Sequence, residues 1–146
     1  MIQLSKRTMW IITALYALAL VMVSVLPSGK GVLYGWDQGI KPSVQDALHV
    51  PAYAVLVVLA SMAWLLPHNA GYGRVLAVAM ICCVFGAVLE AAQVWIPGRG
   101  ASLTDALLNV AGALVGGGAL AGWRFLTNAR KTPLCGATSA GQEERG

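Results

Sequence analysis

Long apolar runs alternate with short polar segments along the chain. Four runs of about twenty residues carry almost no charge, at 8–26, 49–66, 74–96 and 103–126. Lipid offers the backbone no hydrogen-bond partners, so a run of this kind has to satisfy its own backbone as a helix. The pattern therefore predicts an all-α fold: a polytopic membrane protein built as a compact bundle of four transmembrane helices.

The polar segments between the runs suggest the domain organisation. A basic head at 1–7 precedes the four-helix domain at 8–126, and a small, polar stretch at 127–146 is predicted to be a flexible tail. The first apolar run is longer than the hydrophobic part of a signal peptide, which is about 7–15 residues. We therefore interpret this run as a membrane anchor.

Polar or small residues recur near the ends of three runs at intervals of three or four positions, the spacing of one helical face. The three sets are Asp46, His49 and Tyr53; Gly86, Glu90 and Gln93; and Asp105, Asn109, Gly112 and Gly116. The glycines predict close packing between helices. Ser102 and Asp105 have the spacing of a capping box, and Ser43 and Asp46 repeat it.

Basic residues near the ends of the runs predict the topology. Cytoplasmic segments carry the excess of lysine and arginine. Six such residues lie near the run ends on the side of the two termini, against three on the other side. The six are Lys6, Arg7, Arg74, Arg124, Arg130 and Lys131, and the three are Lys30, Lys41 and Arg99. Both termini are therefore predicted to be cytoplasmic. In that orientation the polar faces converge as a cluster at the extracytoplasmic end of the bundle, near Arg99.

Composition and charge narrow the function. Hydrophobic residues make up 58% of the chain and charged residues 11%, against about 25% charged in a soluble domain. The net charge of +4 is concentrated at span ends and does not indicate nucleic-acid binding. Cys82 and Cys83 are adjacent within a span and Cys135 stands alone, so no disulfide framework is predicted. No cofactor motif or tight metal-ligand motif is present, and neither group is predicted.

The whole series of polar residues resembles one family of proteins. It reads Asp46-x-x-His49-x-x-x-Tyr53, Glu90-x-x-Gln93, Arg99, Ser102-x-x-Asp105-x-x-x-Asn109 and Gly112. Over about 41–118 this series is similar to the VanZ-like family of small bacterial membrane proteins, named after a member linked to resistance to the glycopeptide teicoplanin. The resemblance implies the bacterial cytoplasmic (inner) membrane and a role in the cell envelope. Pro51 departs from the pattern, because it enters the second run early and is expected to bend it.

Two functional hypotheses follow. In the first, the pocket binds or processes an anionic lipid headgroup or a lipid-linked envelope precursor. Arg99 then takes the phosphate, and buried carboxylates and the imidazole provide acid–base chemistry. The candidate catalytic residues are Glu90, His49, Asp105 and Asp46. The candidate substrate-binding residues are Arg99, Gln93, Tyr53, Ser102 and Asn109.

In the second hypothesis the same residues are architectural. Asp46 and Asp105 then act as helix-terminal carboxylates, and Glu90 forms an ion pair with Arg99. Gly86, Gly112 and Gly116 serve helix packing under both hypotheses. A metal site built from the carboxylates and His49 is a minor variant of the first hypothesis. The sequence leaves open whether the chain catalyses a reaction, and whether it forms an oligomer or binds a protein partner.

Overall fold

The computed structural model describes residues 5–25, 42–65, 71–96 and 99–129, and this part of the chain contains helices and no strands. The helices are α1 (Lys6–Val25), α2 (Pro42–Ala47), α3 (His49–Leu65), α4 (Tyr72–Ala92) followed by the 3₁₀ turn η1 (Gln93–Trp95), and α5 (Leu103–Ala129). The predicted all-α fold is confirmed. The segments predicted as a loop at 27–41 and as a tail beyond 129, and the side chain of Ser43, lie outside the described residues.

Within the described residues, three segments are long and apolar enough to cross a membrane: Lys6–Val25, Tyr72–Trp95 and Leu103–Asn128. The fourth apolar helix, at His49–Trp64, is shorter. A turn at Leu48 separates this helix, α3, from α2. Pro51 has no N–H to donate to the carbonyl of Ala47, four residues earlier, so the helix that α2 begins cannot continue unbroken.

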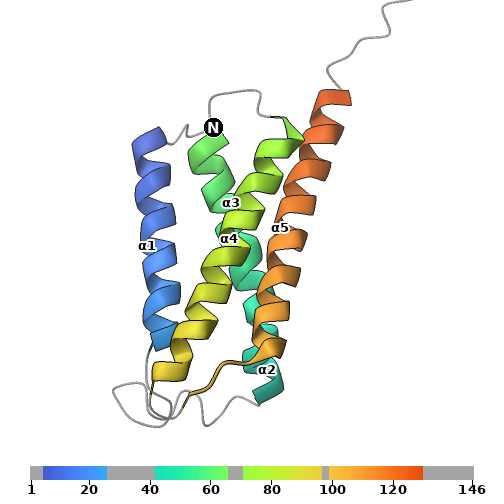
Figure 1. Ribbon diagram of the computed structural model, residues 1–146. Coiled ribbons are helices and arrows are strands. Elements are labelled where there is room, and N and C mark those ends of the chain that lie inside the picture. Colours follow the sequence, from blue (N-terminus) through green and yellow to red (C-terminus); the bar gives the residue numbers. More distant parts are fainter. Residues whose placement is uncertain (1–4, 26–41, 66–70, 97–98, 130–146) are drawn as a thin grey trace, which may run out of the picture.

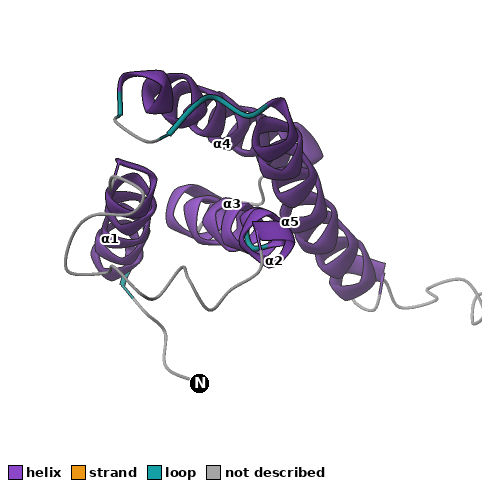
Figure 2. Ribbon diagram, turned by 90° about the horizontal axis from the view of Figure 1, so that it is seen from below, coloured by secondary structure: helices purple, strands orange, loops and turns teal. Residues whose placement is uncertain are grey.

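The four longer helices stand side by side, and the chain direction alternates from each one to the next (Figure 1). As a result, the C-terminal ends of α1 and α4 and the N-terminal ends of α3 and α5 lie at the same end of the molecule, next to α2. Figure 2 looks at the molecule from this end, with α3 lying between α1 and α5. Helices α3 and α4 each contact all three of the other long helices.

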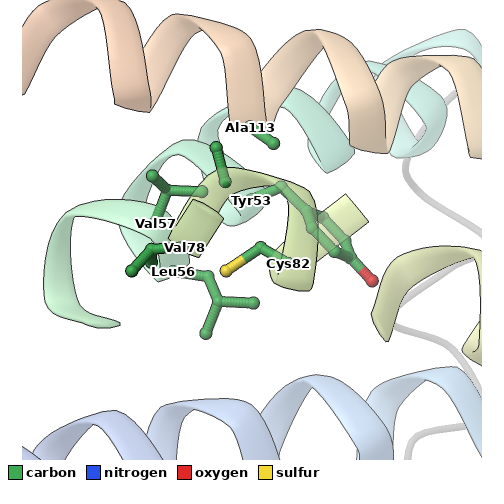
Figure 3. Close-up of a cluster of buried hydrophobic side chains, with 7 residues drawn as sticks. Tyr53, Leu56, Val57, Val78, Cys82 and Ala113 are labelled. Atoms are coloured by element: carbon green, nitrogen blue, oxygen red, sulfur yellow. The ribbon is translucent and has the colours of Figure 1, made fainter. Parts of the chain in front are cut away.

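A small apolar core lies where α3, α4 and α5 meet (Figure 3). Its members are Tyr53, Leu56 and Val57 of α3; Val78, Ala79 and Cys82 of α4; and Ala113 of α5. Large apolar side chains such as Leu18, Val84 and Leu114 remain exposed on the outside of the helices. That distribution suits a protein whose surroundings are hydrocarbon, because lipid chains cover the exposed apolar surface.

Helices α3 and α5 approach each other at backbone distance. A Cβ atom added to Gly112 would lie 2.4 Å from the carbonyl oxygen of Val50, and one added to Gly116 would lie 2.4 Å from that of Ala54. Gly118 and Gly122, further along α5, have no such neighbour within 4 Å. Hence of the two glycine pairs spaced four residues apart on α5, the pair nearer its N-terminus is the one that contacts α3.

Candidate functional site

Glu90 joins the end of α4 to the start of α5. Its side chain is buried, with 6% of its surface exposed. The carboxylate oxygen Oε1 accepts a hydrogen bond from the backbone N–H of Ser102, at 2.5 Å. A backbone N–H that donates to a carboxylate makes a charge-assisted bond, which is stronger than a bond between neutral groups. The Glu90 carboxylate thereby ties the connection that follows η1 back onto α4.

Ser102 is the N-cap of α5. Its hydroxyl oxygen accepts the backbone N–H of Asp105 at 3.2 Å, and its carbonyl accepts that of Ala106 at 3.1 Å. In a capping box the side chain at the position of Asp105 would accept the backbone N–H of the N-cap residue. Here Glu90 accepts that N–H. Within the described part of the chain, the half-buried Asp105 carboxylate has neither a hydrogen-bond nor an ion-pair partner.

Arg99 lies in the connection between η1 and α5, and its side chain is half-buried. Its backbone N–H donates to the carbonyl of Ile96 at 3.1 Å. The guanidinium Nε is buried and has no hydrogen-bond partner. Among the residues that the structure describes, no carboxylate lies within the 4.0 Å of an ion pair with Arg99. The Glu90–Arg99 pair considered under the architectural hypothesis is therefore not formed.

Asn109 lies one turn beyond Asp105 on the face of α5 that continues to Gly112 and therefore faces α3. It is the most buried of the predicted site residues, with 2% of its surface exposed. Its amide oxygen Oδ1 is buried without a hydrogen-bond partner. An unsatisfied buried acceptor costs about 1–3 kcal/mol, so this position is unfavourable for the fold by itself.

His49 and Asp46 are connected through the backbone. The Nδ1 atom of His49 lies 3.0 Å from the carbonyl oxygen of Asp46. Because a carbonyl can only accept, Nδ1 is the donor in this contact. Both residues are half-buried. The imidazole is thus oriented by a main-chain group, and the Asp46 carboxylate takes no part in that bond.

Tyr53 and Gln93 make contacts between helices. A Cβ atom on Gly86 would lie 2.8 Å from the ring carbon Cε1 of Tyr53, so the absence of a side chain at Gly86 makes room for the ring. The Tyr53 hydroxyl points out of the apolar core, towards the C-terminal part of α4 (Figure 3). Gln93 is buried, and its amide nitrogen donates to the carbonyl of Ser24 in the last turn of α1 at 3.4 Å.

Sequence reasoning did not single out Tyr16 as a polar residue that links helices. Its hydroxyl donates to the carbonyl of Ala52 at 3.0 Å and so links α1 to α3. The signal was a phenol in the middle of an apolar run, because a hydroxyl in hydrocarbon needs a protein partner. The partner is a backbone carbonyl, which has no signature in the sequence.

The described residues do not support the metal variant. In residues 5–25, 42–65, 71–96 and 99–129, no three histidine, cysteine, aspartate or glutamate side chains lie close enough to hold a metal ion. A groove of about 240 Å³ between α3 and α5, lined by residues such as Val58, Gly116 and Ala119, is wholly apolar. The polar pocket expected from the sequence remains a prediction.

Fold and composition together define a helical membrane protein with apolar helices and a set of buried polar residues. A family model described as VanZ/LLP1 matches residues 13–124, which is most of the chain. The protein belongs to this family, as the series of polar residues predicted, and the match extends beyond 41–118 on both sides. No curated protein and no solved structure matches the chain.

Proposed function

We propose that the protein crosses the bacterial inner membrane four times and binds an anionic lipid headgroup or lipid-linked cell-envelope precursor. Helix α3, with 17 residues, is about 25 Å long and provides the fourth crossing together with the turn and α2 before it. Both termini lie in the cytoplasm. The binding site is then at the outer end of the bundle, where α4 ends and α5 begins.

The state of Arg99 carries the proposal. A guanidinium is always charged and recognises phosphate through two parallel hydrogen bonds. This one is half-buried, its Nε has no partner, and no carboxylate of the described residues is paired with it. A buried donor left without an acceptor costs about 1–3 kcal/mol. A phosphate bound at Arg99 would remove that cost, which is a reason for binding that an already paired arginine would lack.

The test is lipid retention by the purified protein. Native mass spectrometry of the gently solubilised chain is compared with that of Arg99→Ala and Arg99→Lys. Arg74→Ala is the matched control, because Arg74 is an exposed arginine at the start of α4, at the opposite end of the molecule. We expect Arg99→Ala to lose a phosphate-bearing lipid that the parent and Arg74→Ala retain, and Arg99→Lys to retain it in part. Equal retention by all four proteins would refute the proposal.

The architectural hypothesis is the second candidate, and the contacts of Glu90 and Gln93 favour it. Glu90 accepts a hydrogen bond from a backbone N–H of another segment, and Gln93 donates one to a backbone carbonyl of another segment. Residues that hold a helix bundle together make contacts of this kind. Under this hypothesis, variants at Glu90 lose folding or expression rather than lipid. The acid–base roles of Glu90, His49, Asp105 and Asp46 remain predictions, and they require that a lipid incubated with the protein be converted to a product.

A further inference from the structure

The hydrogen bonds at the start of α5 give the carboxylates of Glu90 and Asp105 different roles. Glu90 accepts the backbone N–H of Ser102, the bond that Asp105 would make in an ordinary capping box. The Glu90 carboxylate is therefore already hydrogen-bonded within the fold, and the Asp105 carboxylate does not make this bond. If the proposed binding function holds, Asp105 is the carboxylate that is free to meet a ligand.

We infer that the ligand carries a hydrogen-bond donor beside its phosphate, and that Asp105 and Asn109 accept from this donor. Glu90 acts as a positioning residue that holds the N-terminus of α5. The inference rests on the proposed function and names the chemical class more closely. The ligand is a phosphate-bearing headgroup that also presents a hydroxyl or a protonated amine.

Asn109 is the independent observation that points to a ligand. Its amide oxygen is an acceptor without a donor, at a side chain that is 2% exposed. It lies one turn deeper than Asp105 on the same face of α5, or about 6 Å along the helix axis. Two acceptors stacked on one helical face, one charged and one neutral, suit a group that donates hydrogen bonds.

Arg99 supplies the complementary half. Its Nε is a donor without an acceptor, and Arg99 and Asp105 are not paired with each other although both are described and lie six residues apart. A donor on one side and acceptors on the other match a ligand with the opposite arrangement. A phosphodiester that bears a hydroxyl or ammonium group has that arrangement, whereas a bare phosphate or a quaternary ammonium headgroup lacks the donor.

The experiment uses lipid pairs that differ in this one property. Phosphatidylglycerol and phosphatidylmethanol have the same charge, and only the first has headgroup hydroxyls. Phosphatidylethanolamine and phosphatidylcholine are both zwitterionic, and only the first has N–H donors. Each pair is offered in equal amounts to the full chain in mixed vesicles, and retained lipid is measured by native mass spectrometry. We expect the donor-bearing member to be retained about tenfold more or better in at least one pair, the ratio typical of a hydrogen bond to a charged group.

Variants connect the preference to the residues. Asp105→Ala and Asn109→Leu should lose the preference within each pair and keep phosphate-dependent retention, and Arg99→Ala should lose retention of every lipid. Asn109→Leu should also raise the melting temperature, because leucine has a similar size and removes an unsatisfied acceptor. A structural amide would behave in the opposite way. A lower melting temperature of Asn109→Leu, with the lipid preference unchanged, would overturn the role of Asn109.

Glu90 is tested by a conservative and a disruptive change. Glu90→Gln still offers an oxygen to the Ser102 N–H, so it should keep both the fold and the lipid preference. Glu90→Leu leaves that N–H unsatisfied and should lower the melting temperature. If Glu90→Gln abolished the preference in a protein as stable as the parent, Glu90 would be a ligand-contacting residue and the positioning role would be wrong.

The two proposals fail in different ways. Equal retention of both members of each pair, with loss of all of them in Arg99→Ala, would overturn the inference about the donor and leave the proposed function standing. Retention that does not depend on Arg99 would overturn the proposed function, and the inference with it.

Discussion

The close approach of α3 and α5 gives a prediction whose size can be worked out from the structure. A methyl group added at Gly112 or Gly116 would lie 2.4 Å from a backbone carbonyl oxygen of α3, whereas ordinary contacts begin at 3.4 Å. A carbonyl in a helix cannot move alone, so the two helices would have to separate by about 1 Å. The separation would loosen the contact between α3 and α5 over the stretch from Asn109 to the apolar core.

The energy of the change has two terms. Overpacking of a closely packed contact costs about 1–3 kcal/mol, and replacing glycine by alanine within a helix gains up to about 1 kcal/mol. At Gly112 and Gly116 the first term outweighs the second, so we expect Gly112→Ala and Gly116→Ala to be less stable than the parent. At Gly118 and Gly122, where nothing lies within 4 Å, the second term acts alone.

Gly118→Ala and Gly122→Ala are therefore matched controls on the same helix. We expect their melting temperatures in detergent to equal or exceed that of the parent, and those of Gly112→Ala and Gly116→Ala to fall below it. Thermal unfolding can be followed by circular dichroism or by loss of the monodisperse peak in size-exclusion chromatography. If all four variants shifted alike, the backbone contact between α3 and α5 would be wrong.

Three further predictions concern single contacts. Gly86→Ala should lower the melting temperature in the parent but much less in a Tyr53→Leu background, because the clash is with the tyrosine ring; equal shifts in both backgrounds would contradict that contact. Ser102→Ala should cost about 0.5–2 kcal/mol as a lost N-cap, and so should Ser5→Ala, whose hydroxyl oxygen caps α1 in the same way, but only Ser102→Ala should alter lipid retention. Tyr16→Phe should cost about 1 kcal/mol through its lost bond to α3, and an unchanged melting temperature would show that the bond contributes nothing.

Local properties of the sequence account for what could be predicted. Length and apolarity located the helices, and α3 begins at His49, where its apolar run begins. Spacing of three and four placed Gly112 on the face of α5 that the structure turns towards α3. These features depend on residues within one or two turns of each other, and a single sequence contains that information.

There is a definite physical reason why the partners of the polar side chains could not be predicted. Glu90, Gln93, Tyr16 and His49 all bond to main-chain groups. Every residue has such groups, so no sequence pattern marks the one that is used. A search for complementary side chains therefore paired Glu90 with Arg99, the nearest opposite charge in the chain, although these two residues are not paired in the structure.

The Ser102 N–H is accepted by Glu90, which is distant in the sequence, and not by the local carboxylate of Asp105. This difference changes which groups of the proposed site are available. Had Asp105 closed its own capping box, Glu90 would have been a buried charge in need of a ligand or an ion, and the site would have centred on α4. Because Glu90 accepts the Ser102 N–H instead, it is satisfied within the fold. Among the described residues near the start of α5, the buried atoms without a hydrogen-bond partner are then Nε of Arg99 and Oδ1 of Asn109. Under the proposed function, the groups left for a ligand belong to α5 and the connection before it: one guanidinium, one carboxylate and one amide oxygen. Under the proposed function, the carboxylate that accepts the Ser102 N–H thus decides which residues are left to meet a ligand.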